Sequence, residues 1–252
     1  MTTPSTPRLL GATVLRVDRA TSTNDLLREL AAQGAREGTV VVAREQSAGR
    51  GRRGRAWLSP PGGLWCSLLL RPPDPSDGRI ALAAAVGAAE GIRTVCGISV
   101  GLKWPNDLML GRGKVGGILV ESVPPAVILG VGINVNVDPA TFPARIAGGA
   151  ASLAAVLHYP VDLEGVLVAV LAGIDAAYGM LRAGRAAELL QRWRRFSVTL
   201  GRPVRIDDGA GLVEGLAIDV DADGALLVEA TGGKRTRVIA GDVTMLDVGG
   251  QR

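Results

Sequence analysis

Lysine is rare in this chain, and the position of one lysine suggests chemistry. Of the 28 basic residues 25 are arginines, and the three lysines are Lys103, Lys114 and Lys234. Lys114 leads into the apolar segment Val115–Glu121, which contains two adjacent glycines. A lysine at the start of a buried strand is partly desolvated and rigidly held, as a catalytic cation should be. We therefore take Lys114 as the main catalytic candidate.

A second group of candidates is the segment Gly49–Arg55, with the sequence GRGRRGR, which we call the arginine loop. Guanidinium groups bind phosphate or carboxylate through fixed pairs of donors, and glycines let the backbone approach an anion closely. The segment also matches G-x-G-x-x-G, but Pro60 and Pro61 follow it and disfavour the helix that a dinucleotide-binding fold requires. A solvated basic loop or a nucleic-acid patch is the alternative to an anion-binding loop.

The scarcity of histidine and cysteine excludes other chemistries. The single histidine, His158, and the two cysteines, Cys66 and Cys96, are too few for a zinc site or a disulfide framework. His158 has no evident catalytic partner nearby and is expected to lie at the surface or to be structural. The segment Met1–Leu10 has no signal-peptide pattern, and no run of 18 apolar residues occurs, so we expect a soluble cytoplasmic protein. A net charge of +4 is too small to indicate nucleic-acid binding.

Hydrophobic periodicity predicts the elements that must position these residues. A capped helix is expected to begin at Ser22 and to end at Gly34. Apolar runs predict strands over 39–43, 64–70, 99–104, 117–122 and 126–131. Helical spacing predicts further helices over 79–95, 162–181 and 186–196.

The pattern changes after residue 197. Short apolar stretches at 203–206, 212–220, 226–230 and 235–239 are separated by Asp-Gly and Gly-Gly turns. Such a series is typical of a small antiparallel barrel. We therefore expect two domains, 1–197 and 198–252.

Taken together, the motifs resemble those of one family. Ser22-Thr23-Asn24, Gln46 with the arginine loop, Lys103–Asp107, Lys114–Glu121 and Gly130–Asn134 occur in the order and spacing of biotin protein ligases. The resemblance covers about residues 15–247. It implies an α+β catalytic domain around a mixed, mostly antiparallel sheet, as in class II synthetases, followed by an SH3-like barrel.

The resemblance also implies a reaction. ATP and biotin would give biotinyl-5′-AMP and pyrophosphate, and a lysine of a biotin carboxyl carrier protein would then accept the biotin. Because two anions must meet, fixed cations and Mg²⁺ suit this chemistry better than a histidine base. Some members carry a DNA-binding domain of roughly 60 residues before the pocket motif, which starts at Ser22 here. We therefore expect no DNA or membrane partner, and a monomer or weak homodimer.

The resemblance assigns roles by position. Catalysis falls to Lys114, Arg50 and Arg52. Biotin contacts fall to Ser22, Thr23, Asn24, Gln46, Gly49, Arg50, Gly51, Arg52, Lys114, Gly116 and Gly117. ATP or adenylate contacts fall to Arg52, Arg53, Arg55, Trp57, Asn106, Asp107, Lys114 and Asn134. No metal ligand is assigned with assurance, and Trp65 could pack on biotin or in the core. The rival interpretations are a lipoate or octanoate ligase or transferase of the same fold, and a basic nucleic-acid-binding module.

Overall fold

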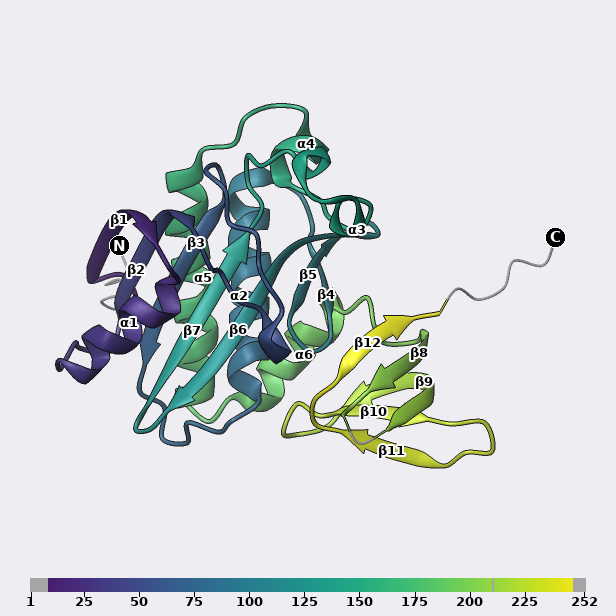
Figure 1. The fold of residues 1–252 in the computed structure, drawn as a ribbon. Coiled ribbons are helices and arrows are strands. Elements are labelled where there is room, and N and C mark those ends of the chain that lie inside the picture. Colours follow the sequence, from purple (N-terminus) through teal and green to yellow (C-terminus); the bar gives the residue numbers. More distant parts are fainter. Residues whose placement is uncertain (1–8, 210, 247–252) are drawn as a thin grey trace, which may run out of the picture.

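The computed structural model describes residues 9–209 and 211–246 of the chain. Residues 1–8, where no signal peptide is expected, and 247–252, at the end of the second expected domain, lie outside the described residues. The chain forms a larger unit around one sheet and a smaller C-terminal unit around another (Figure 1).

The larger unit is built on seven strands. They are β1 (Thr13–Ala20), β2 (Thr39–Gln46), β3 (Leu64–Leu70), β4 (Gly101–Lys103), β5 (Asp107–Leu110), β6 (Gly113–Val123) and β7 (Ala126–Ile133). Their order in the sheet is β1-β2-β3-β7-β6-β5-β4. Among the strand pairs that the structure describes, β1 and β2 run parallel and the others antiparallel, which confirms the expected mixed, mostly antiparallel sheet.

Helices cover both faces of this sheet. They are α1 (Thr23–Ala32), α2 (Arg79–Cys96), α3 (Ala144–Ala147), α4 (Leu153–Leu157), α5 (Leu163–Arg182) and α6 (Ala186–Phe196), with short 3-10 turns η1 (Arg52–Gly54) and η2 (Pro139–Thr141). Figure 1 shows α2 and α5 behind the sheet and α1 in front. Successive strand residues point to opposite faces, so Val40 and Leu68 join the α2–α5 core while Val41 and Leu69 pack with α1. Burial on both faces explains why β2 and β3 are apolar runs rather than alternating ones.

Two glycines allow α2 and α5 to pack closely. A Cβ on Gly173 of α5 would lie 2.1 Å from the carbonyl oxygen of Gly87 in α2. By length and composition α5 is apolar enough to cross a membrane, but its buried side chains, such as Val170 and Ile174, pack in the same cluster as Val86 of α2. The glycine contact and this cluster place α5 in the interior of the fold.

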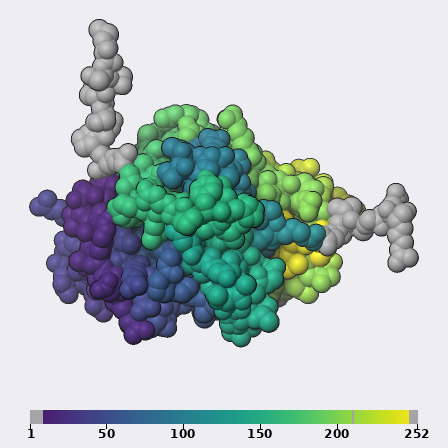
Figure 2. All heavy atoms as spheres, turned by 90° about the horizontal axis from the view of Figure 1, so that it is seen from above, coloured from purple at the N-terminus to yellow at the C-terminus, as the bar shows by residue number. Residues whose placement is uncertain are grey.

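The C-terminal unit is the expected SH3-like barrel. Its strands are β8 (Pro203–Asp207), β9 (Leu212–Val220), β10 (Leu226–Glu229), β11 (Arg235–Val238) and β12 (Asp242–Met245), in the order β11-β10-β9-β8-β12. The indole nitrogen of Trp104 donates to the Gly224 carbonyl at 3.0 Å, and Arg194 pairs with Asp219 at 2.6 Å. Seen from above in Figure 2, the yellow-green barrel packs directly against the larger unit.

Several local expectations differ from the structure. The strands β1, β5 and β12 and the short helices α3 and α4 were not predicted, because β1 is a polar edge strand and the others have at most five residues. Ser22 precedes α1, but within the described chain its side chain makes no capping hydrogen bond, and it lines a cavity instead. His158 is exposed at the end of α4, which agrees with the surface position allowed for it.

Candidate functional site

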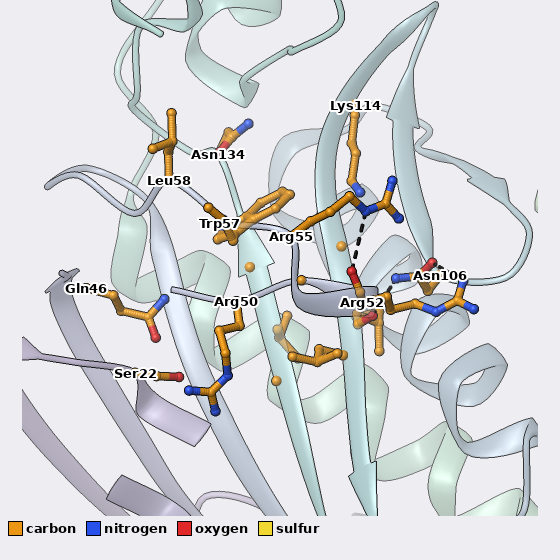
Figure 3. A pocket seen from close by; sticks show the side chains of 18 of the residues that line it. Ser22, Gln46, Arg50, Arg52, Arg55, Trp57, Leu58, Asn106, Lys114 and Asn134 are labelled. Carbon is orange, nitrogen blue, oxygen red and sulfur yellow. Dashed lines mark hydrogen bonds between the residues drawn. The ribbon is translucent and has the colours of Figure 1, made fainter. Parts of the chain in front are cut away.

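One cavity of about 520 Å³ brings together most of the residues singled out in the sequence. The cavity lies on the face of the sheet that carries α1, next to the first residues of that helix. The arginine loop forms part of its lining. Figure 3 shows Ser22, Gln46 and Arg50 toward one end, Lys114 and Asn106 toward the other, and Trp57 between them. Gly49, Arg53, Asp107 and Gly116 lie outside the lining of this cavity.

The end near α1 is a rigid set of hydrogen-bonding groups. The backbone nitrogen and the hydroxyl of Thr23 both donate to Gln46 Oε1, at 2.8 and 3.0 Å. Ser67 hydrogen-bonds Asn24 Oδ1 at 2.5 Å, and Gln46 Nε2 donates to Ser59 at 2.8 Å. Ser22, Thr23 and Asn24 are at most 4% exposed. Fixed donors and acceptors at the positive end of a helix suit a neutral ligand group that carries both N–H and C=O.

Small residues form the floor of the cavity. A Cβ on Gly132 would lie 2.6 Å from the Trp57 indole nitrogen, and one on Gly130 would lie 2.6 Å from Asn24 Oδ1. Gly117 on the neighbouring strand β6 continues this floor. Gly116, by contrast, packs against the Gly132 carbonyl behind the sheet surface. The floor is therefore narrow and smooth, as an extended aliphatic chain would require.

The opposite end is cationic. Lys114 Nζ lies 2.5 Å from Asp107 Oδ1 and 5.2 Å from the centre of the Trp57 ring. The backbone of Lys114 is held on both sides, because its nitrogen donates to the Gly149 carbonyl and its carbonyl accepts from the Ala151 nitrogen. The sequence-based expectation that Lys114 leads into a buried strand on a rigid support agrees with this geometry.

Arg52 supplies a second cation at this end. Its guanidinium donates to Asn106 Oδ1 at 3.3 Å and to the Gly241 carbonyl at 3.2 Å. Burial lowers the pKa of Arg52, while the charges of Asp242 and Asp107 act in the opposite direction. Burial likewise lowers the pKa of Lys103. Cations in a poorly solvated place attract anions strongly, so this end suits phosphate groups.

Arg50 is held at the mouth of the cavity by carboxylates. Both of its terminal nitrogens contact Asp25, at 2.5 and 2.6 Å, and Glu121 lies 3.6 Å away. Hydrogen bonding from Arg50, with a further contribution from Arg28, keeps the pKa of Asp25 below its ordinary value. Glu121 also accepts from Asn24 Nδ2 at 2.7 Å. The arginine loop is thus connected to the polar end of the cavity through Glu121.

Two buried polar atoms have no hydrogen-bond partner within the described residues: the Trp57 indole nitrogen and Asn134 Oδ1. Both side chains line the cavity, and Asn134 Nδ2 donates to the Ala151 carbonyl at 2.9 Å, which fixes the direction of its amide. An unsatisfied buried donor or acceptor costs free energy. A ligand that carries an N–H donor next to Asn134 would remove this cost.

The lining also contains residues that were not predicted. They are mostly apolar or small and include Ile118, Leu119, Phe142, Arg145, Ile146, Gly149 and Ala150. Residues 142–150 carry no periodic pattern that would predict an element. The sequence feature that could have indicated a binding site is Arg145 close to Gly148 and Gly149. Trp65, left open between ligand and core, is 1% exposed and meets Trp57 edge-on at 6.3 Å, so it supports the cavity wall from the core.

The structure of the arginine loop agrees neither with a dinucleotide-binding motif nor with a basic patch for nucleic acid. The loop forms the short 3-10 turn η1 rather than the long helix of a dinucleotide-binding motif. Arg50, Arg53 and Arg55 contact carboxylates of this chain. The loop is thus folded against its own protein instead of forming an open basic patch for nucleic acid.

Comparison with known proteins identifies the family. Residues 15–138 match the model of the "Biotin/lipoate A/B protein ligase family", and residues 199–246 match that of the "Biotin protein ligase C terminal domain". The bifunctional ligase/repressor BirA of Bacillus subtilis is 34% identical over 94% of this chain and 75% of its own length. The biotin–acetyl-CoA-carboxylase ligase of Mycobacterium tuberculosis is 33% identical over 89% of this chain and 86% of its own.

A solved structure agrees with these relatives. The biotin protein ligase from Aquifex aeolicus in complex with biotin and ATP superposes with a TM-score of 0.85 at 28% identity, over 93% of this chain and 99% of that one. The named relatives are biotin ligases, so the comparisons do not favour the lipoate alternative. On the strength of the BirA match, this chain belongs to the biotin protein ligase family.

Proposed function

We propose that this chain is an ATP-dependent, AMP-forming biotin protein ligase. It activates biotin to biotinyl-5′-AMP and transfers the biotin to a lysine of a biotin carboxyl carrier protein. The observation that carries this proposal is one continuous cavity, which joins a rigid hydrogen-bonding end to a cationic end across a floor of glycines. A ureido ring, an aliphatic tail and a carboxylate next to a nucleotide phosphate match these three parts in order.

Biotin lies with its ureido ring among the groups near α1. Ser22, Thr23, Asn24 and Gln46 hydrogen-bond the ring, since they offer donors and acceptors in fixed positions. The valeryl tail passes over Gly117, with Gly116 behind it. The loop that closes over the tail contains Gly49, Arg50 and Gly51. Gly49 allows the loop backbone to approach Trp57 closely and does not touch biotin.

The first half-reaction takes place at the cationic end. A carboxylate oxygen of biotin attacks the α-phosphorus of ATP, and pyrophosphate leaves with the electron pair of the broken P–O bond. Lys114 and Arg52 stabilise the charge that builds up on the phosphoryl oxygens. Lys114 Nζ lies 2.5 Å from Asp107 Oδ1. The ammonium group therefore contacts Asp107 and the incoming anions at the same time. Arg55 reaches the same side of the cavity, whereas Arg53 faces the barrel.

The adenine lies beside the two buried atoms without partners. Asn134 Oδ1 accepts from the exocyclic amine of adenine, and the Trp57 indole packs against the adenylate. Such a contact satisfies a buried acceptor and so favours adenine over a base that carries a carbonyl at this position.

In the second half-reaction the acceptor lysine attacks the carbonyl carbon of the mixed anhydride, and AMP leaves. Asn106 and Asp107 position the phosphates and the incoming amine. Among residues 9–209 and 211–246 no group of three or more His, Cys, Asp or Glu could hold a metal. Mg²⁺ usually binds through substrate phosphates and one or two carboxylates, and Asp107, next to Lys114, would supply a carboxylate at this end. Mg²⁺ bound with ATP would neutralise phosphate charge.

The partners follow from the reaction. The acceptor is a biotin carboxyl carrier protein, and we expect no DNA or membrane partner. We place the enzyme in the cytoplasm as a monomer or weak homodimer. Sedimentation velocity with and without biotin and ATP tests the assembly.

ATP–pyrophosphate exchange measured in parallel with biotin, lipoate and octanoate tests the proposed function. Exchange that depends on biotin is expected, followed by transfer of biotin to a purified carrier domain. Exchange with lipoate or octanoate but not with biotin would overturn the proposal.

A further inference from the structure

The C-terminal barrel carries two carboxylates next to each other on neighbouring strands. Asp207 at the end of β8 lies directly opposite Asp242 at the start of β12 in the register of the sheet. Like charges in directly opposite positions destabilise a strand pair. The two side chains are 59% and 34% exposed, so solvent offsets part of this repulsion but not all of it. The barrel alone therefore has an unfavourable charge arrangement at this edge, which we call the acidic pair.

The arginine loop of the larger unit neutralises the acidic pair. Arg53 Nη1 lies 3.2 Å from Asp242 Oδ2 and 3.7 Å from Asp207 Oδ2, between the two carboxylates. Arg53 Nη2 also donates to the Asp207 carbonyl at 3.0 Å, and Arg55 Nη2 donates to Asp242 Oδ1 at 2.6 Å. Two arginines of the loop thus meet two carboxylates of the barrel, across more than 150 residues of sequence.

The same edge of the barrel also reaches Arg52, which lines the cavity. Arg52 Nη1 donates to the carbonyl of Gly241, the residue before Asp242. A Cβ on Gly241 would lie 2.5 Å from the Ile206 side chain and 3.1 Å from the Asp207 carbonyl, so a larger residue would push this strand away. The contact between barrel and loop therefore extends from the surface into the reaction site.

The backbone of the loop adopts an unfavourable conformation at Arg53, the residue that makes these contacts. Arg53 has φ 54° and ψ 34°, a left-handed conformation that costs free energy for a residue with a side chain. Such a conformation persists where surrounding contacts fix it. The contacts of Arg53 with the acidic pair are of this kind, whereas Arg53 lies outside the cavity lining.

We propose that Asp242, together with Asp207, is a positioning residue that holds the arginine loop closed over the adenylate. This inference rests on the proposed function and assigns the barrel a part in it. The barrel completes the reaction site because it holds the loop from outside. Arg53 makes the contact with the acidic pair, and this contact fixes the position of Arg52 in the cavity. Loss of the acidic pair leaves the strands and α1 beside the cavity in place but lets the loop that lines it open.

The test compares Asp242→Asn, Arg53→Gln and the double variant with the wild-type full-length chain. The matched control is Asp223→Asn, which removes a barrel carboxylate that pairs with Arg237 within the barrel. Three measurements are made: hydrogen exchange of the loop amides without ligand, the KM for ATP in pyrophosphate exchange, and labelling of an unrelated lysine-rich protein by escaped biotinyl-5′-AMP. Thermal unfolding confirms that each variant is folded.

We expect Asp242→Asn to speed exchange in the loop and to raise both the KM for ATP and the stray labelling roughly three- to tenfold, as the loss of a small ion-pair network allows. Arg53→Gln should behave alike, and the double variant should be little worse than either single one because the two residues act on one contact. Asp242→Glu should restore part of the retention.

The outcomes separate two failures. Unchanged loop exchange and unchanged adenylate retention in Asp242→Asn, or effects that simply add in the double variant, would overturn the positioning role while the ligase activity stands. A wild-type chain that forms no biotinyl-5′-AMP would overturn the proposed function. In that case the loop exchange of Asp242→Asn still decides whether the acidic pair holds the loop.

Discussion

At the scale of single residues, two cations that line the cavity, Lys114 and Arg52, differ from the arginines that hold the loop to carboxylates. Lys114 stands at the cavity with a fixed backbone, and its partner Asp107 keeps it there without closing the cavity. Arg50 and Arg53 are bound to carboxylates of the chain itself. We therefore expect a substrate anion to bind at Lys114 and Arg52, with Lys114 remaining next to Asp107.

Replacing Lys114 by alanine should reduce biotin-dependent pyrophosphate exchange about 100- to 1,000-fold, the usual effect of removing a group that stabilises transition-state charge. Lys114→Arg should recover little, since a planar guanidinium does not replace a compact ammonium. The exposed Lys234 provides the control, and Lys234→Ala should exchange like the wild type. Exchange by Lys114→Ala within a fewfold of the wild type would remove Lys114 from the mechanism.

The Asp25–Arg50 pair makes a prediction about pH. Because Arg50 lowers the pKa of Asp25 below 3.8, the pair stabilises the fold above that pH, and this contribution is lost as the pH falls through the lowered pKa. Asp25→Asn should therefore cost about 1 kcal/mol of unfolding free energy near neutral pH. The cost should shrink below about pH 3.8. Denaturant unfolding from pH 7 to pH 2.5 measures this.

The exposed Asp18 is the control for that experiment. Asp18→Asn should change the unfolding free energy little at either pH. A cost of Asp25→Asn that stays constant down to pH 2.5 would contradict a role for its charge.

The residues that line the cavity were easier to predict than the residues that hold them in position. Lys114, Asn24 and Gln46 combine a chemical group with a recognisable spacing, and they line the cavity. The partners Asp25 and Asp242 look like ordinary surface carboxylates in the sequence. Their contacts depend on how the loop folds over distant elements, which no local pattern records.

At the scale of elements, the predictable parts were those with a long apolar pattern. Strand β3 and helix α6 have the predicted bounds, because β3 is apolar except for Ser67 and α6 carries a periodic apolar set. Strand β1 escaped prediction, since most of its residues are exposed at the edge of the sheet. The order of strands could not be read from the sequence either, because it depends on long-range pairing such as β3 with β7.

The close contact of α2 and α5 leads to a stability prediction. Gly173→Ala should destabilise the fold by about 1–3 kcal/mol, because the new methyl group would overlap the Gly87 backbone and force the helices apart. Gly179 in the same helix has nothing within 4 Å of an added Cβ, so Gly179→Ala should stabilise by up to about 1 kcal/mol. Chemical denaturation of both variants measures the difference.

Equal effects of the two substitutions would show that helix propensity, not the approach of α2, sets the response. The rate of biotin-dependent pyrophosphate exchange provides a second measurement on the Gly173→Ala variant. The α2–α5 pair lies on the face of the sheet opposite α1, so a folded Gly173→Ala protein should keep its exchange rate.

At the scale of the whole molecule, the two units share one core. The buried apolar cluster that contains Val86 and Val170 also contains Val204, Leu226 and Val243 of the barrel. The boundary expected near residue 197 would fall between α6 and β8, yet the apolar packing is continuous from one unit to the other. Units joined through a buried apolar core unfold together, in contrast to units with a small polar interface. We therefore expect a single thermal transition for the wild-type chain.

Trp104 is the residue that tests this coupling. It is 2% exposed, its backbone nitrogen donates to the Thr199 hydroxyl oxygen at 2.8 Å, and its indole donates to the Gly224 carbonyl. Trp104→Phe removes one hydrogen bond and should cost about 1 kcal/mol with a single transition retained. Trp104→Ala opens a cavity between the units, should cost about 3–5 kcal/mol, and should split the calorimetric transition in two. A single sharp transition in Trp104→Ala would show that the remaining shared core suffices to couple barrel and sheet.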